Sequence, residues 1–184
     1  MKYFLILLVL GISLVSCQEA EPRRPTKVRT GSFFKETIKR NKELLAQEEK
    51  LIKAIIAKDT AHTYLSSSKG SWYYYDIKND SVSYTPKPDD LVIFTYNMVS
   101  FSNDTIYKSE EMGTIKYKVD KQNLFPGLRN SIKLLREGET ATFLFPSSLA
   151  FGYHGDNKKI GTNIPVKSTI TLLNIDRQKD SIQN

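Results

Sequence analysis

The clearest hydrophobic pattern in the chain is a short helical stripe within residues 124–135. Leu128, Ile132 and Leu135 recur at intervals of four and three residues, so a helix places them on one face. Gly138 stands where a C-terminal cap glycine is expected. The pattern predicts one short helix that packs by this face against neighbouring strands.

Alternating patterns on both sides of this helix are typical of β-strands. In residues 114–119, for example, Ile115, Tyr117 and Val119 lie on one face and two lysines on the other. One short helix among many strands predicts a curved sheet with the helix as its plug. The expected strands are residues 72–77, 91–99, 114–119, 140–145 and 167–175.

The segment before these strands is helical in pattern from about Ser32 to Lys58. Paired aliphatic residues recur from Leu44 to Ile56 and form a narrow stripe, which Asn41 and Glu48 interrupt. Residues 32–66 are therefore expected to be an N-terminal helical segment, and a serine-rich loop separates them from a main domain over residues 70–178. Two interpretations of the helix stay open: it docks on its own domain, or it is a dimerisation arm.

The first residues have the pattern of a bacterial lipoprotein signal. Lys2 precedes an uncharged run that is too short to span a bilayer comfortably, and the run ends in Leu14-Val15-Ser16-Cys17, which looks like a lipobox. We expect residues 1–16 to be a signal peptide, Cys17 to be lipidated, and residues 17–31 to be a flexible tether. The alternative is an ordinary signal peptide with a chance cysteine.

Further features of the N-terminus concern location. Cys17 is the single cysteine of the 184-residue chain, so no intramolecular disulfide can form. Gln18-Glu19 follows it in place of an aspartate that retains lipoproteins in the inner membrane, and this favours the outer membrane, facing the periplasm. The expected location is therefore the cell envelope.

The composition excludes several classes of function. The formal net charge is +7, but both signs are mixed along the chain and no dense basic block appears, so nucleic-acid binding is not favoured. The chain has two histidines, and its histidine and cysteine residues do not have the spacing of metal ligands. The sequence also contains no nucleophile elbow, phosphate-binding loop or dinucleotide-binding motif. We expect no metal and no cofactor.

A long connection over residues 146–166 gives the positive signal for a site. It contains three glycines and Pro165, and connections of this length without regular structure often carry function. The residues left for such a site are aromatic and aliphatic. They suit the binding of an apolar or prolyl group rather than proton transfer.

From Gly70 to about Asp176 the chain resembles the FKBP-type peptidyl-prolyl cis-trans isomerases. The order and spacing of several short motifs carry this resemblance. They are Lys87-Pro88-Asp89-Asp90, Val92-Ile93-Phe94-Thr95-Tyr96, Asp104-Thr105-Ile106-Tyr107-Lys108-Ser109, Phe125-Pro126-Gly127-Leu128, Glu137-Gly138-Glu139, Pro146-Ser147-Ser148-Leu149-Ala150-Phe151-Gly152 and Ile164-Pro165-Val166.

The resemblance implies an α+β fold, a curved antiparallel sheet wrapped around one short helix, preceded here by the N-terminal helix. It also implies an apolar substrate pocket, in which the Phe125 N–H binds a ligand carbonyl and no residue acts as acid or base. The implied pocket residues are Tyr96, Tyr107, Ile115, Leu124, Phe125, Leu128, Phe151, Ile164 and Leu172.

Three positions depart from the family's pattern. Lys108 stands where an aspartate is common, Phe151 lacks the hydroxyl of the usual tyrosine, and Leu172 replaces a frequent phenylalanine. We therefore expect weak binding of macrolides such as FK506. The implied function is prolyl isomerisation that assists the folding of exported or membrane-associated proteins.

Two alternatives stay open. One is a catalytically weak FKBP-like binding or assembly module, which the departures at Lys108, Phe151 and Leu172 support. Its setting would be an envelope machinery for gliding motility or secretion, since the lipobox and helical arm are similar to the gliding-motility lipoproteins of Bacteroidetes. The other is an unrelated lipocalin-like or structural lipoprotein. The expected partners are prolyl-containing proteins, the membrane through a lipid anchor, and a second copy through the N-terminal helix.

Overall fold

The computed structural model describes residues 30–178, so the expected signal peptide, Cys17 and nearly all of the expected tether lie outside the described residues. The chain divides into two compact units, Met1–Thr37 and Ile38–Asn184. The described part of the first unit is the opening turns of helix α2 (Thr30–Lys58). Every contact described below belongs to the second unit.

Helix α2 ends at Lys58, as the helical pattern predicted, inside the expected helical segment 32–66. The carboxylate of Asp59 accepts hydrogen bonds from the Ala61 N–H at 3.1 Å and the Tyr64 hydroxyl at 2.9 Å, and these local bonds replace the continuing helix. Beyond this turn the short strand β1 (Leu65–Ser66) pairs with β2 (Trp72–Ile77). The sheet therefore begins a few residues before the expected domain start at residue 70.

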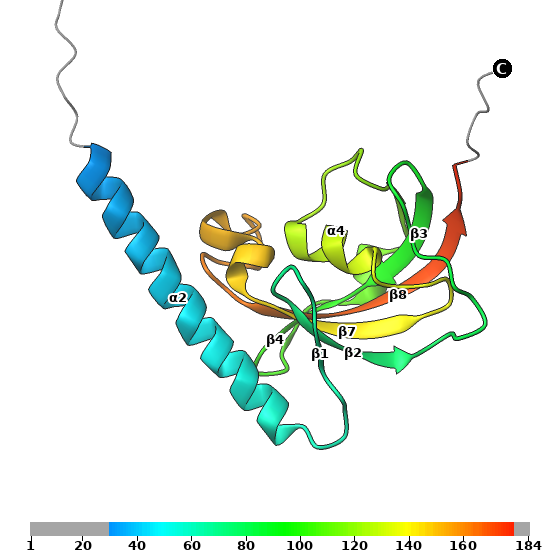
Figure 1. Ribbon diagram of the computed structural model, residues 1–184, viewed down its shortest axis with the longest axis horizontal. Helices are drawn as coiled ribbons and strands as arrows, with labels where there is room; N and C mark the ends of the chain where they lie inside the picture. Colours follow the sequence, from blue (N-terminus) through cyan, green and yellow to red (C-terminus); the bar gives the residue numbers. More distant parts are fainter. Residues whose placement is uncertain (1–29, 179–184) are drawn as a thin grey trace, which may run out of the picture. The chain divides into compact units, whose positions relative to one another are not determined.

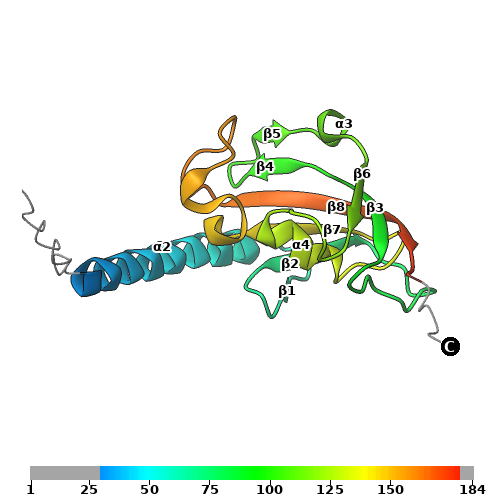
Figure 2. The same cartoon turned by 90° about the horizontal axis from the view of Figure 1, so that it is seen from above.

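The strands form one antiparallel sheet of eight strands in the described chain (Figure 1). Its main order is β1-β2-β7-β8-β3-β6, and the short pair β4–β5 continues from β8 (Figure 2). The other strands are β3 (Leu91–Tyr96), β4 (Met98–Ser100), β5 (Thr105–Tyr107), β6 (Ile115–Lys118), β7 (Thr140–Phe145) and β8 (Val166–Asp176).

The expected strand 91–99 is broken at Asn97. The Asn97 side-chain oxygen accepts the Thr169 N–H at 2.8 Å, and its carbonyl accepts the Ser168 hydroxyl at 2.6 Å. These bonds replace regular ladder pairing at one residue and separate β3 from β4. Because alternation of apolar residues continues through this point, the sequence pattern did not reveal the break.

Helix α4 (Pro126–Ile132) lies over one face of the sheet (Figure 1). Leu128, Ile132 and Leu135 are fully buried, as their spacing predicted. The helix is shorter than expected and Gly138 is not its cap. Gly138 has a φ of +82° in the turn before β7, and its N–H bonds to the Leu172 carbonyl of β8 at 2.8 Å.

The short elements complete the fold around α4. Helix α3 (Ser109–Met112) follows β5, and the connection 146–166 contains two 3-10 helices, η1 (Ser147–Leu149) and η2 (Gly152–His154). The expected fold class, an α+β fold with a curved antiparallel sheet around one helix and an N-terminal helix before it, is confirmed.

Between residues 30 and 178, no helix combines the length and the apolar character needed to cross a bilayer. The same part of the chain holds no group of three or more histidine, cysteine, aspartate or glutamate side chains placed to bind a metal ion.

Candidate functional site

Eight of the nine expected site residues belong to the buried core or pack against it. Tyr96, Leu128 and Leu172 belong to the buried core, from the end of β3, from α4 and from β8. Five more of the nine expected residues pack against that core from the surface side. They are Tyr107, Ile115, Leu124, Phe125 and Phe151.

Aromatic rings form the centre of this arrangement. The ring of Phe125 lies 6.3 Å from Tyr96, 5.8 Å from Phe145 and 5.1 Å from Phe151, measured between ring centroids. Edge and tilted contacts of this kind hold rings in fixed relative positions. We call Tyr96, Phe125, Phe145 and Phe151 the aromatic cluster. Phe145 was not expected as a site residue, because the strand pattern alone assigns it to the core.

The backbone before α4 places Phe125 in the cluster. Phe125 is the N-cap residue, with an extended φ and ψ of −61° and 148°, and Pro126 opens the helix at its first position. The Phe125 carbonyl accepts the Arg129 N–H at 3.1 Å. In the described residues no acceptor bonds to the Phe125 N–H itself, so this donor is available to a ligand.

Gly127 lets the helix approach the sheet and η1 closely. A Cβ at this position would lie 2.7 Å from Cδ1 of Phe145 and 2.8 Å from the Leu149 carbonyl oxygen. Both distances are shorter than van der Waals contact. The glycine of the Phe-Pro-Gly-Leu motif is therefore required for packing between α4, β7 and η1.

Tyr107 and the loop after η2 form one side of the site. The Tyr107 hydroxyl donates to Oδ2 of Asp156 at 2.5 Å, and Lys159 Nζ lies 4.5 Å from the centroid of the Tyr107 ring. Lys159 also donates to the Ile106 carbonyl at 3.1 Å and to Glu111 at 2.7 Å. These contacts fasten the loop to β5 and α3.

The electrostatics of this side follow from the same contacts. Burial raises the pKa of Asp156, but hydrogen bonds from the Tyr107 hydroxyl and the backbone N–H groups of Ile160, Lys158 and Lys159 outweigh it, so the pKa lies below its ordinary value. The bond to Asp156, together with desolvation, raises the pKa of Tyr107. Burial raises the pKa of Tyr96, and the nearby Tyr107 adds to the effect. At neutral pH the two phenols are therefore neutral and Asp156 is charged.

Two expected features lie at the edge of the site. Ile164 is 40% exposed and is not part of the core or of the residues packed against it. Lys108 is exposed and occupies the N-cap position of α3, where its side chain makes no capping bond. The carboxylate beside the site comes instead from Asp156, which sequence reasoning missed because a single aspartate in a glycine-containing loop gives no distinct signal.

The arrangement can bind but is not organised for acid–base or metal chemistry. The expected site residues are aromatic and aliphatic, and the Phe125 N–H has no acceptor among the described residues. No described residue at the site pairs a nucleophile with a base. The geometry therefore suits an apolar ring held beside a hydrogen-bonded carbonyl.

Comparison with known proteins finds similarity to one family of enzymes. Residues 83–173 match the family described as FKBP-type peptidyl-prolyl cis-trans isomerase. The chain is 29% identical over 137 residues to a probable FKBP-type peptidyl-prolyl cis-trans isomerase, FkpA, of Neisseria meningitidis serogroup B. This match covers 74% of the chain and 47% of that protein, so the chain spans about half the length of this curated relative.

Solved structures show the same fold. The crystal structure of FkpA from Escherichia coli superposes with a TM-score of 0.59 at 19% identity, covering 92% of this chain and 81% of that one. A peptidyl-prolyl cis-trans isomerase from Pseudomonas syringae pv. tomato gives 0.57 at 15% identity, covering 74% and 96%. At these identities the likeness concerns the fold alone.

Proposed function

With its residues 83–173 the chain belongs to the FKBP-type peptidyl-prolyl cis-trans isomerase family, and we propose that it catalyses the cis–trans isomerisation of X–Pro bonds. The observation that carries the proposal is the aromatic cluster. Phe125 joins Tyr96 and Phe151 at centroid distances of 6.3 and 5.1 Å, and Leu128 of the same helix is fully buried. A proline ring is apolar and flat enough to pack on such a surface.

The proposed mechanism needs no covalent step. Rotation about an X–Pro bond is slow because the planar amide has resonance, with a barrier of about 18–20 kcal/mol. The twisted transition state has lost resonance and is less polar than the planar amide, so a dry apolar surface favours it. The Phe125 N–H holds a neighbouring carbonyl while the chain rotates. Each ~1.4 kcal/mol of preferential stabilisation is a tenfold gain in rate.

A protease-coupled assay with a prolyl peptide tests this function. We expect wild type to accelerate isomerisation and Tyr96→Ala to return the rate to the uncatalysed background. Tyr73→Ala is the matched control, because Tyr73 is an aromatic residue of β2 that stacks on Phe143 at 5.0 Å and lies outside the aromatic cluster. Equal rates for wild type and Tyr96→Ala, with both folded by circular dichroism, would refute catalysis.

A second candidate is a binding or assembly module with little turnover. The specific observation in its favour is Phe151, which contacts Phe125 but has no hydroxyl to donate to a ligand carbonyl. Lys108 and Leu172 are the other departures. In this case the prolyl peptide binds, the assay shows only background, and Phe151→Tyr raises either turnover or affinity for FK506. An envelope machinery such as that of gliding motility is the setting this candidate implies.

The proposed setting is the cell envelope, where the domain assists the folding of exported or membrane-associated proteins. Support comes from the lipobox at residues 14–17 and the absence of an aspartate after Cys17. We propose a lipid anchor at Cys17 in the outer membrane, facing the periplasm. Metabolic labelling with palmitate should mark wild type and not Cys17→Ser; equal labelling of the two would contradict the anchor.

A homodimer through α2 is the proposed assembly. Ile52 of α2 is fully buried, while Ile38 and Leu45, which lie on nearly the same helical face, are 54% and 38% exposed. An apolar helix face that continues beyond its own domain is typical of a protein interface.

A further inference from the structure

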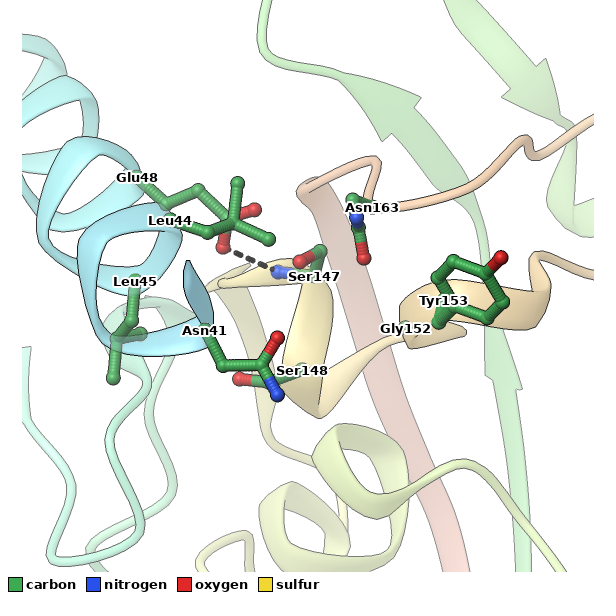
Figure 3. A pocket seen from close by; sticks show the side chains of 9 residues that line it. All are labelled: Asn41, Leu44, Leu45, Glu48, Ser147, Ser148, Gly152, Tyr153 and Asn163. Atoms are coloured by element: carbon green, nitrogen blue, oxygen red, sulfur yellow. Dashed lines mark hydrogen bonds between the residues drawn. The ribbon is translucent and has the colours of Figure 1, made fainter. Parts of the chain in front are cut away.

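A cavity lies between α2 and the two 3-10 helices (Figure 3). Its volume is about 160 Å³. None of the expected site residues lines it. The lining residues are Asn41, Leu44, Leu45, Glu48, Ser147, Ser148, Gly152, Tyr153 and Asn163.

Glu48 is the one charged residue among the nine that line this cavity. It is only 4% exposed, although it is a glutamate on a helix. Its Oε2 accepts the Ser147 N–H of η1 at 2.9 Å, and its Oε1 is buried with no hydrogen-bond partner (Figure 3). Within residues 30–178 no lysine, arginine or histidine forms a salt bridge with Glu48.

This environment is unusual for a carboxylate. Buried charges in proteins are normally paired, because an unpaired one loses its hydration without compensation. A carboxylate offers about four lone-pair positions, and Glu48 uses one of them on Ser147. The remaining lone pairs of the Glu48 carboxylate, and its negative charge, suit a hydrogen-bond donor that carries a positive charge. A hard metal ion fits less well, since calcium takes about 6–8 oxygen ligands and the cavity has a single carboxylate.

Size and wall chemistry define the cation further. The cavity volume of about 160 Å³ is less than the roughly 300 Å³ or more of a typical small-molecule site. It is suited to one side chain. Leu44, Leu45 and Tyr153 offer apolar walls for a methylene stem, and the Glu48 carboxylate offers the partner for its charged end.

The cavity adjoins the proposed prolyl site through the backbone. Gly152 follows Phe151 of the aromatic cluster, and Asn163 precedes Ile164 at the rim of that site. The Asn163 N–H donates to the Gly152 carbonyl at 2.8 Å, so these two segments form a common wall. A polypeptide whose proline is bound at the aromatic cluster can therefore place the side chain of a nearby residue in the cavity, on the other side of this wall.

We propose that the cavity binds a lysine or arginine side chain of the same polypeptide whose proline is bound at the aromatic cluster. This inference rests on the proposed function, and it makes the protein selective for prolyl segments with a basic residue at a fixed distance. Glu48 is the residue that confers the selectivity.

The test is a binding measurement with pairs of neutral, capped prolyl peptides. One member of each pair carries lysine and the other norleucine, which has the same carbon chain without the ammonium, at one to four residues on either side of the proline. Dissociation constants come from amide shifts of the isotope-labelled full-length protein in detergent. At one position we expect lysine to bind about tenfold more tightly, as for a charge-assisted hydrogen bond, with shifts at Ser148 and Asn163.

Two variants decide the role of Glu48. Glu48→Gln keeps an oxygen for the Ser147 N–H but removes the charge, so the preference for lysine should disappear while the norleucine peptides bind as before. Glu49→Gln makes the same chemical change at the adjacent residue, outside the cavity lining, and should keep the preference. Equal binding of lysine and norleucine at every position, or a preference that survives in Glu48→Gln, would overturn the proposal.

The failure of the proposed function gives a different result. If no prolyl peptide binds, isomerase function is lost but the cavity is still testable with Nα-acetyl-lysine methylamide and its norleucine analogue. Shifts at Ser147 and Ser148 with the lysine compound alone support the cavity as a cation site. No shift with either compound overturns it.

Discussion

Asp156 and Tyr107 determine at the residue scale how the loop after η2 is held. The Asp156 carboxylate accepts the Tyr107 hydroxyl and also the Ile160 N–H at 2.8 Å and the Lys158 N–H at 2.9 Å. Because residue 108 is a lysine, neither sequence neighbour of Tyr107 carries a carboxyl group. The loop supplies that acid from 49 residues away.

This contact predicts an acid-sensitive loop. The pKa of Asp156 is below its ordinary value of 3.8, so its stabilisation is fully present above pH 3.8 and is lost as the pH falls through the lowered pKa. The Ile160 amide should therefore be protected from hydrogen exchange at neutral pH, where Asp156 is ionised. Its protection should decrease in acid, when Asp156 becomes protonated. Asp156→Asn should remove that acid transition. An unchanged transition in Asp156→Asn would assign it to another carboxyl group.

Gly127 makes a prediction about packing. In Gly127→Ala the new methyl group overlaps the Phe145 ring and the Leu149 carbonyl, at 2.7 and 2.8 Å, so α4 must move away from β7 and η1. We expect a loss of about 1–3 kcal/mol in the free energy of unfolding, measured with urea. In Gly161→Ala the nearest side-chain atom to the new methyl is 3.8 Å away, and stability should be nearly unchanged. Equal stability of the two variants would argue against the close approach.

At the scale of the element, α4 joins the fold to the site. Phe125 at its start belongs to the aromatic cluster, and Ile132 at its end is fully buried. Phe125→Asp should abolish isomerisation in a domain that still folds, because Phe125 is only partly buried. Ile132→Asp should unfold the domain, at a cost above about 4 kcal/mol. Thermal melting separates these outcomes, and an equal loss of stability in both variants would mean that the whole segment is core.

Helix α2 docks through a small number of residues. Ile52 is fully buried, and its neighbour Leu51 is 55% exposed. Ile52→Ala should weaken the docking by about 2–5 kcal/mol, which hydrogen exchange of the α2 amides would report as faster opening. Leu51→Ala is the control and should change exchange little. Similar exchange in the two variants would mean that Glu48 and not Ile52 holds the helix.

Much of this organisation was accessible from the sequence, and the exceptions have identifiable causes. The strands at 72–77 and 140–145 were predicted with their observed bounds, the first from its run of aromatic residues and the second from its alternating apolar residues. The break at Asn97 was not, since it depends on side-chain bonds to Thr169 of another strand. Glu48 was taken as an interruption of the α2 stripe, whereas it lies at the centre of the docked face. Its partner, Ser147, is 99 residues away and no local pattern reveals it.

The same limit applies to the site. Tyr96, Leu128 and Phe125 were identified through motifs whose order is a property of the sequence. Asp156 and Phe145 take part through contacts between distant strands and loops. Ile164 was expected in the pocket and stands at its exposed rim.

For the whole molecule, the apolar face of α2 predicts the state of assembly. A dimer formed through this face should dissociate when a charge is placed on it, because a buried unpaired charge is costly. Light scattering should give the mass of a dimer for wild type and of a monomer for Ile38→Glu. Leu65→Glu, at a 43% exposed position of β1, should remain dimeric. A monomeric wild type would exclude this assembly.

The position of β8 has a consequence for biosynthesis. It is the last strand of the described chain, yet it lies inside the sheet, where it pairs with β7, β3 and β4. A growing chain that has not reached Val166 therefore has no strand to join β3 to β7. Folding of the domain must wait until β8 has been made, and until then the nascent chain exposes its unpaired strands to whatever chaperone is present.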